Sequence, residues 1–180
     1  ATAPKNSSTK PADTAVILCN LGTPDAPTTT AVRRYLAEFL SDPRVVDLPR
    51  LLWLPILWGA VLPKRPAQSA AKYQKIWLGK WADGRSSPLM HYSLAQAAGL
   101  QTRLGSSATV YTAMRYGQPA LPQVLSQAQA AGARRIVLLP LYPQYSCTTT
   151  ASVLDSVQTW QKTQAHTNKA QSHPLPTIRT

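Results

Sequence analysis

The loop after residue 139 carries the densest set of chemically capable side chains in this chain. It holds two phenols, an amide, hydroxyls and a thiol. The apolar run at 134–139 ahead of it predicts a buried strand, and the strand ends at the following prolines, which cannot donate to a ladder. Ligands of open α/β sheets bind outside the carboxyl ends of strands. We therefore expect a binding site in this loop, formed by Tyr142, Tyr145, Ser146 and Cys147.

Apolar runs separated by glycine and proline predict the elements that must position this loop. Strands are expected at 15–19, 108–114 and 134–139, with a further strand beginning near residue 175. Helices are expected at 29–40, 66–77, 94–104 and 121–128, and from residue 153 onward. The apolar run at 51–62 is broken by Pro55 and is too short to cross a bilayer. Alternating strands and helices favour an α/β fold with a doubly wound parallel sheet.

Composition narrows the function classes. A hydrophobic content of 44% indicates a folded protein. The formal charge of +12 would suit a polyanion partner, but the cations are dispersed and no nucleic-acid motif accompanies them, so no nucleic-acid partner is expected. The two cysteines do not suggest a disulfide framework, and the polar start lacks a secretory signal. We expect a cytoplasmic protein with a disordered tail at 1–13.

Four segments, in order, resemble the ferrochelatase family, which inserts ferrous iron into a porphyrin. The loop reads Leu-Tyr-Pro-Gln-Tyr-Ser-Cys-Thr-Thr at 141–149, and the first strand and its loop read Ala-Val-Ile-Leu-Cys-Asn-Leu-Gly-Thr-Pro at 15–24. Residues 63–76, with Ser87 and Pro88 after them, resemble the family's porphyrin-facing helix and turn. Residues 113–119, Ala-Met-Arg-Tyr-Gly-Gln-Pro, resemble its second strand end. The chain is identified as the amino-terminal lobe of a bacterial-type member.

The resemblance implies a division of the chain. The family has two α/β lobes with the porphyrin between them, and here the second lobe is largely absent. Residues 14–163 are expected to form the first lobe, and 164–180 a linker and the start of a truncated second lobe. The family's metal-site histidine and glutamate belong to the second lobe, so no catalytic residue is assigned and the isolated chain is expected to be inactive. The alternative is a tetrapyrrole-binding half-protein without catalysis.

The resemblance also implies porphyrin-binding residues. Arg65, Tyr73 and Ser87 match porphyrin contacts of the family, and an arginine can hold a propionate by paired hydrogen bonds. Spacing alone would favour a solvated arginine, a half-buried tyrosine and a turn serine. Leu21 matches a position beside the metal face of the macrocycle. Because leucine cannot ligate iron, we expect a hydrophobic wall there.

Two further matches leave the structural alternative open. Arg115 matches an arginine of the family's inner pocket, and a salt-bridged structural arginine is the rival interpretation. Tyr142 matches a pocket-lining tyrosine, against a core tyrosine whose hydroxyl is satisfied.

The partners expected from the resemblance are ferrous iron and protoporphyrin IX as substrates, with no tightly bound cofactor. A 2Fe–2S cluster, which animal members hold through the cysteine at position 147, needs four thiolates. Only Cys19 accompanies Cys147, so Cys147 is expected to be a packed thiol. The segment Leu51–Leu62 resembles the apolar lip of the family's cleft. Its apolar surface would allow peripheral contact with the inner face of a membrane.

Overall fold

The computed structural model describes residues 13–77, 87–168 and 175–180. The strands are β1 (Thr14–Thr23), β2 (Thr109–Gly117), β3 (Arg135–Pro140) and β4 (Thr177–Arg179). The helices are α1 (Thr29–Ser41), α2 (Arg50–Ile56), α3 (Leu62–Ile76), α4 (Pro88–Leu104), α5 (Leu121–Ala130) and α6 (Ser152–Asn168). Two π-helical turns, η1 (Leu57–Val61) and η2 (Cys147–Ala151), precede α3 and α6.

All four strands run parallel, in the order β2-β1-β3-β4. The central strand β1 pairs with both neighbours, so that Ala15 lies opposite Thr109 on one side and Ile136 on the other. Its residues 15–19 are buried, which is why the segment reads as an almost unbroken apolar run. The predicted parallel α/β fold is confirmed.

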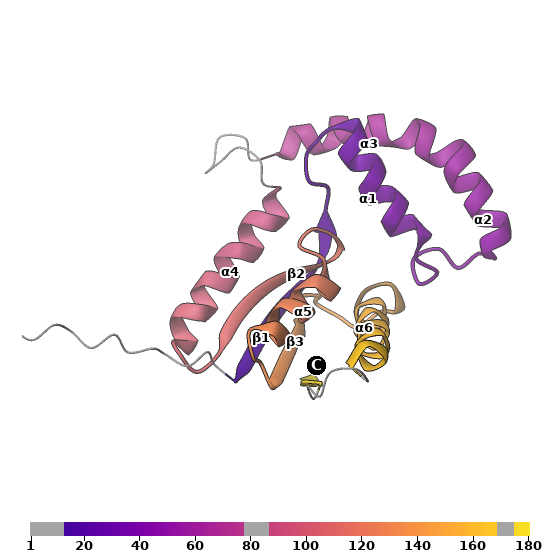
Figure 1. The fold of residues 1–180 in the computed structure, drawn as a ribbon. Helices are drawn as coiled ribbons and strands as arrows, with labels where there is room; N and C mark the ends of the chain where they lie inside the picture. Colours follow the sequence, from indigo (N-terminus) through magenta and orange to yellow (C-terminus); the bar gives the residue numbers. More distant parts are fainter. Residues whose placement is uncertain (1–12, 78–86, 169–174) are drawn as a thin grey trace, which may run out of the picture.

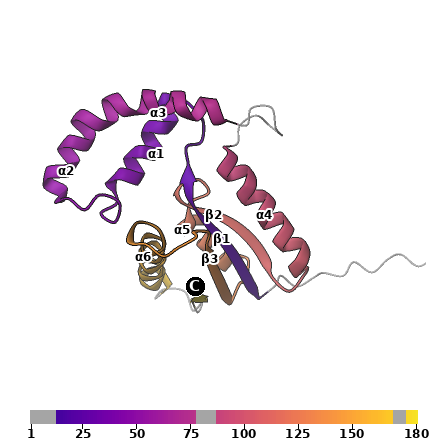
Figure 2. The same ribbon diagram turned by 180° about the vertical axis from the view of Figure 1, so that it is seen from behind.

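Helices cover both faces of the sheet (Figures 1 and 2). On one face, α5 and α6 bury Leu121, Leu125 and Val153 against alternate strand residues such as Ile17 and Ile136. On the other face α4 packs on β1 and β2 through a smaller cluster that includes Leu18 and Leu100. The period-two alternation of the strands therefore supplies one large core and one small one.

The carboxyl-terminal elements belong to the same sheet. The predicted boundary at residue 163 falls inside α6, which continues to Asn168, so the polar segment after 160 is partly helical. The last strand β4 pairs with β3, with Ile178 opposite Ile136. The division into a lobe and a linker remains a prediction.

Residues 29–76, which we call the helical arm, extend beyond the carboxyl end of β1 (Figure 1). Pro55 was expected to break the run at 51–62, but α2, η1 and α3 follow one another without a gap from Arg50 to Ile76. The proline removes one backbone donor. Solvent can hydrate the carbonyl that this leaves free, because Leu51 is 90% exposed.

The π-helical turn η1 keeps one side of this long helix buried. The backbone N–H of Leu62 donates to the carbonyl of Leu57, five residues earlier, and both side chains are fully buried. A regular α-helix would rotate residues five apart to different sides. The extra residue in the π turn restores the phase, so the buried side that begins at Leu57 continues into α3 through Leu62, Pro66 and Ala70.

The start of α4 also differs from expectation. The helix begins at Pro88 rather than near Leu94, because the Ser87 side chain accepts a hydrogen bond from the backbone N–H of Met90 at 3.2 Å. Serine followed by proline is a favourable start for a helix, since the proline lacks only a donor that would be unpaired there.

The backbone of β1 lies very close to β2 at Gly22. Its φ is +117°, and a Cβ built there would lie 1.8 Å from the carbonyl oxygen of Tyr116 on β2. The strand continues to Thr23, past the end expected at residue 19, because glycine permits this approach.

We predict that Gly22→Ala destabilises the protein by about 3 kcal/mol or more, since a left-handed backbone and a steric clash act together. Gly99→Ala in α4 is the matched control, because no atom lies within 4 Å of its added Cβ. It should stabilise by about 0.5–1 kcal/mol. Denaturant unfolding of both variants measures this, and equal effects would contradict the role assigned to Gly22.

Candidate functional site

The first candidate site is a cavity of about 470 Å³ where the end of β1, the end of α3 and the start of α4 meet. Two of the residues expected from the sequence line it, Tyr73 and Ser87, although they come from different helices. Gly22 and Thr23 supply the wall from β1, and Ile76 and Tyr92 add apolar surface. The structure thus brings together the first strand end and the helix-turn segment of the sequence analysis.

Tyr73 and Ser87 are both preorganised. Tyr73 is half-buried, with its ring edge-on to Trp77 at 6.4 Å between centroids. Burial raises the pKa of the Tyr73 hydroxyl, which therefore stays protonated at neutral pH and can donate. Ser87 is 3% exposed and accepts from Met90 N–H. A serine hydroxyl can accept one bond and still donate its proton.

Sequence reasoning missed the pair that fastens the strand end to α4. Asn20 Nδ2 donates to Ser93 Oγ at 3.3 Å, and the Ser93 hydroxyl donates to the carbonyl of Leu89 at 2.7 Å. Both residues line the cavity. The available signal was an asparagine at the end of a buried apolar run, where a polar side chain needs a partner.

Arg65 and Leu21 line neither this cavity nor the second one described below. Arg65 is exposed on α3, two turns before Tyr73, in accord with the solvated alternative. Leu21 is half-buried within β1, directly before Gly22. Their porphyrin roles remain predictions.

Tyr142 lies just beyond the end of β3, and its ring packs against the larger core cluster. Its hydroxyl is buried and has no hydrogen-bond partner among the described residues, so the satisfied hydroxyl of the core-tyrosine alternative is not observed. Burial, followed by the proximity of Cys19, raises the pKa of this hydroxyl, which stays neutral. The tyrosine is thus a core residue by its contacts, and its role in a porphyrin pocket remains a prediction.

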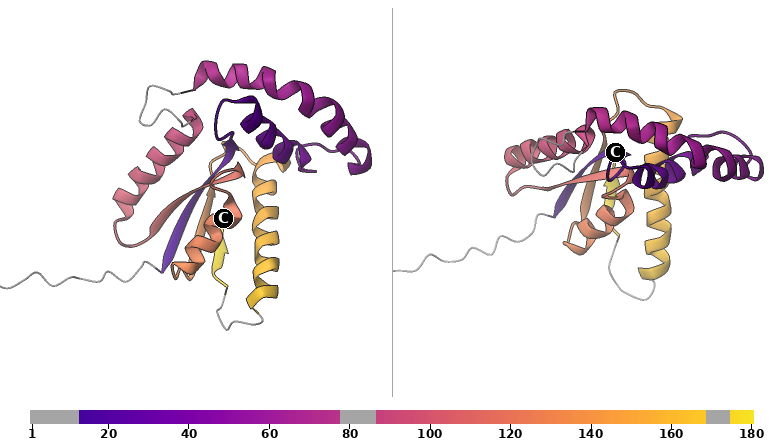
Figure 3. Two further views of the ribbon diagram at one scale, coloured as in Figure 1. Left: turned by 45° about the horizontal axis from the view of Figure 1, so that its top comes forward. Right: turned by 90° about the horizontal axis from the view of Figure 1, so that it is seen from above.

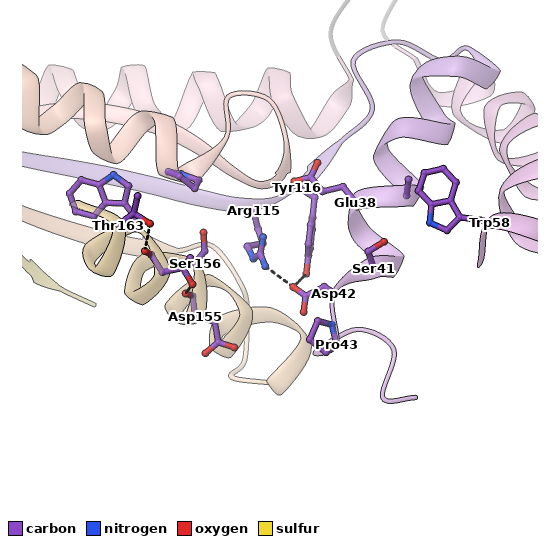
Figure 4. A pocket seen from close by; sticks show the side chains of 14 residues that line it. Glu38, Ser41, Asp42, Pro43, Trp58, Arg115, Tyr116, Asp155, Ser156 and Thr163 are labelled. Atoms are coloured by element: carbon purple, nitrogen blue, oxygen red, sulfur yellow. Dashed lines mark hydrogen bonds and ion pairs between the residues drawn. The ribbon is translucent and has the colours of Figure 1, made fainter. Parts of the chain in front are cut away.

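Arg115 lies at a second cavity, of about 750 Å³, between α1 and α6 (Figure 4). Its Nη2 donates to Asp42 Oδ2 at 2.6 Å, and its Nε donates to Ser152 Oγ at 2.7 Å. The salt-bridged alternative left open by the sequence is therefore what the structure contains. The guanidinium also lies over the Tyr116 ring, 4.5 Å from its centroid.

Asp42 is the centre of this group. Its Oδ2 also accepts from Tyr116 Oη and Ser152 Oγ, each at 2.7 Å, and its Oδ1 accepts from the Arg44 N–H at 2.7 Å. Burial opposes ionisation of Asp42, but the hydrogen bonds and the Arg115 charge prevail and lower its pKa. Burial raises the pKa of Tyr116 to about 12, so the phenol remains a donor.

The cysteines are placed differently from each other. Cys19 is fully buried in β1, and burial raises the pKa of its thiol to about 12. Cys147 was expected to be packed, but it is exposed at the start of η2, because that turn lies on the surface. Over the described ranges, no three His, Cys, Asp or Glu side chains gather where they could hold a metal ion.

The tip of the helical arm exposes large apolar side chains. Leu51, Leu52 and Trp58 are 90%, 66% and 60% exposed, while Trp53 is held by a bond from Nε1 to the Leu40 carbonyl at 2.7 Å. Among the described helices, none has the length and apolar character needed to cross a bilayer.

Comparison with known proteins agrees with the resemblance. A family model described as Ferrochelatase matches residues 13–177. A ferrochelatase of Stenotrophomonas maltophilia (strain R551-3) is 61% identical over 150 residues, covering 83% of this chain and 45% of that protein. Ferrochelatases of Dechloromonas aromatica and Xanthomonas axonopodis pv. citri are 51% and 54% identical, each over 83% of this chain and over 40% and 45% of their own lengths. The chain thus spans less than half the length of these relatives.

We predict that Asp42→Ala costs about 3–5 kcal/mol of unfolding free energy at neutral pH, because it leaves a partly buried guanidinium without its carboxylate. Asp25→Ala is the matched control. Asp25 also pairs with an arginine, Arg34, at 3.0 Å, but both side chains are well exposed, so its loss should cost less than about 1 kcal/mol.

Comparison of Asp42→Ala with the parent chain also tests how the stability depends on pH. Because the folded-state pKa of Asp42 is lowered, its stabilisation is complete above the ordinary carboxyl pKa of about 4 and is lost as pH falls through the folded value. Unfolding free energies measured between neutral and acid pH should therefore fall less steeply in Asp42→Ala than in the parent. Parallel curves would contradict this assignment.

Proposed function

Since the chain belongs to the ferrochelatase family, we propose that it supplies the porphyrin-binding wall of an enzyme of haem biosynthesis that inserts ferrous iron into protoporphyrin IX. The observation that carries this proposal is the convergence of Tyr73, Ser87 and the end of β1 on one cavity. These segments were singled out by resemblance alone, and only folding places them together. Ferrous iron and the porphyrin are the substrates.

The chemistry of this cavity suits a porphyrin edge. The macrocycle is a flat apolar disc that carries two propionates. Ile76 and Tyr92 offer apolar contact, and the neutral phenol of Tyr73 and the hydroxyl of Ser87 donate to a carboxylate. Arg65 on the same helix as Tyr73 supplies the cation that pairs with a propionate outside the cavity. A cavity of about 470 Å³ lies within the range typical of small-molecule sites.

The other three residues expected from the sequence, Leu21, Tyr142 and Arg115, have different parts. Leu21 forms an apolar wall beside Gly22, and Tyr142 fills the core behind the strand ends. Arg115 is neutralised by Asp42 and held by Ser152. Its part is to fix the end of β2 beside the site, and its side chain lines the second cavity.

The apolar tip of the arm supports a proposed location. We propose a cytoplasmic protein that contacts the inner face of the membrane peripherally through Leu51–Leu62. The exposure of Leu51, Leu52 and Trp58 supports this, because contiguous exposed apolar side chains mark interaction surfaces. Such a lip would also admit a poorly soluble porphyrin.

Titration of the chain with protoporphyrin IX tests the binding proposal through quenching of porphyrin fluorescence. Tyr73→Ala should weaken binding by about tenfold, since it removes an aromatic contact and a donor. Leu48→Ala is the control, because that large side chain is 50% exposed and lines neither cavity. Unaltered affinity in Tyr73→Ala, or an equal loss in both variants, would count against this cavity.

Addition of ferrous iron to the porphyrin complex separates binding from catalysis. We expect the 180-residue chain to leave the porphyrin largely metal-free, because the histidine and glutamate of the family belong to the second lobe. Absorbance spectra record insertion, with a full-length relative such as the Stenotrophomonas maltophilia ferrochelatase as the positive control. Insertion at the rate of that enzyme would refute the expectation. Binding without insertion matches the alternative of a tetrapyrrole-binding half-protein for this chain by itself.

A further inference from the structure

Asn20 places an amide at the wall of the cavity that Tyr73 and Ser87 share. Its side chain is half-buried and lines that cavity. Its Oδ1 accepts a hydrogen bond from the backbone N–H of Leu21 at 2.9 Å. Because only the oxygen of an amide side chain can accept from an N–H, this bond fixes the orientation of the amide and assigns Nδ2 as its donor end.

The donor end of this amide is only half used. Nδ2 carries two protons, and one of them is donated to Ser93 Oγ at 3.3 Å. The Ser93 hydroxyl donates in turn to the Leu89 carbonyl at 2.7 Å, and Ser93 is 1% exposed, so this bridge belongs to the packed contact between β1 and α4. The second N–H of Nδ2 has no partner among the described residues.

The cavity itself is uncharged. Its described lining residues include no aspartate, glutamate, lysine or arginine, although the chain has a formal charge of +12. An anionic group that enters is therefore held by neutral donors. Tyr73, Ser87 and Asn20 are such donors from three elements, and Figure 3 shows the ends of β1 and α3 and the start of α4 near one another.

We infer that Asn20 is a specificity-determining residue of this cavity, which donates the second N–H of Nδ2 to a carboxylate oxygen of the ligand. This inference rests on the porphyrin proposal above and adds a donor to it: one propionate lies between Tyr73, Ser87 and Asn20. A hydrogen bond to an ionised acceptor is about twice as strong as one to a neutral acceptor. The bonds to Leu21 and Ser93 hold the donor in place beforehand, so little conformational freedom is lost on binding.

Asn20→Asp tests the inference, because it replaces the free donor by a negatively charged oxygen of nearly the same size. The new carboxylate can still accept from the Leu21 N–H and from the Ser93 hydroxyl, so the fold should persist. In fluorescence titrations the variant should bind protoporphyrin IX about 30-fold more weakly than the parent. The dimethyl ester of protoporphyrin IX has no carboxylate to repel, and its affinity should fall only about threefold.

Gln123→Glu is the matched control. It makes the same change from amide to carboxylate on the exposed side of α5, and Gln123 lines neither cavity. Both affinities should stay within about twofold of the parent. An equal loss for the acid and the ester in Asn20→Asp would mean that Asn20 only supports the fold, and it would overturn the inference. A loss in Gln123→Glu as large as in Asn20→Asp would overturn it too.

Asn20→Ala gives a second test that adds no charge. It removes the donor and should weaken binding of protoporphyrin IX by about tenfold and of the ester by less. Unfolding in denaturant shows whether each variant is folded at the concentrations used. Unchanged affinity for protoporphyrin IX in folded Asn20→Ala would overturn the inference.

The parent chain and Tyr73→Ala separate this inference from the porphyrin proposal. If Tyr73→Ala weakens quenching and both Asn20 variants leave it unchanged, the cavity binds porphyrin and only the role of Asn20 is refuted. If the parent chain does not quench porphyrin fluorescence, the porphyrin proposal is refuted and the role of Asn20 with it.

Discussion

The hydrogen bonds and the ion pair made by the Asp42 carboxylate are the interactions on which the arrangement of this fold depends. Asp42 ends α1, and it binds Arg115 and Tyr116 at the end of β2 and Ser152 at the start of α6. Three elements far apart in sequence are thereby joined at one buried oxygen. Such a group is stable only when complete, because any missing partner leaves a polar or charged atom buried and unpaired.

This group determines where the helical arm can lie. The arm touches the sheet mainly through α1 and β2, supported by Glu38, whose carboxylate accepts from the Gly117 N–H at 2.9 Å, and by Tyr35, which donates to the Gly22 carbonyl at 3.3 Å. These contacts lie around the carboxyl ends of β1 and β2. The end of α3 is thus held near the start of α4, and the cavity that Tyr73 and Ser87 share depends on anchors outside it.

Local patterns were sufficient for most of the fold. The apolar runs predicted the strands because a parallel strand covered on both faces needs apolar residues throughout. They failed at Pro55, because an exposed helix tolerates a proline that usually interrupts one. They also failed at the start of α4, because the hydrophobic spacing begins only at Leu94 whereas the helix begins after the Ser87 cap. In the candidate site, resemblance selected Tyr73 and Ser87, which line one cavity, and Arg65 and Leu21, which line neither cavity described. Asn20, Ser93 and Asp42 were missed because the contacts that join them to other elements span 73 or more residues.

The sequence by itself determined the parallel α/β class, the order of the elements and the resemblance to ferrochelatases. Each of these is a property of neighbouring residues or of an ordered set of motifs. Only the tertiary structure decided that Arg115 is neutralised by Asp42, that Cys147 is exposed and that Leu57 and Leu62, at the two ends of the π turn, are both buried. Those outcomes depend on which groups meet through space and on helical phase, where a single additional residue in a π turn changes the side that a residue faces.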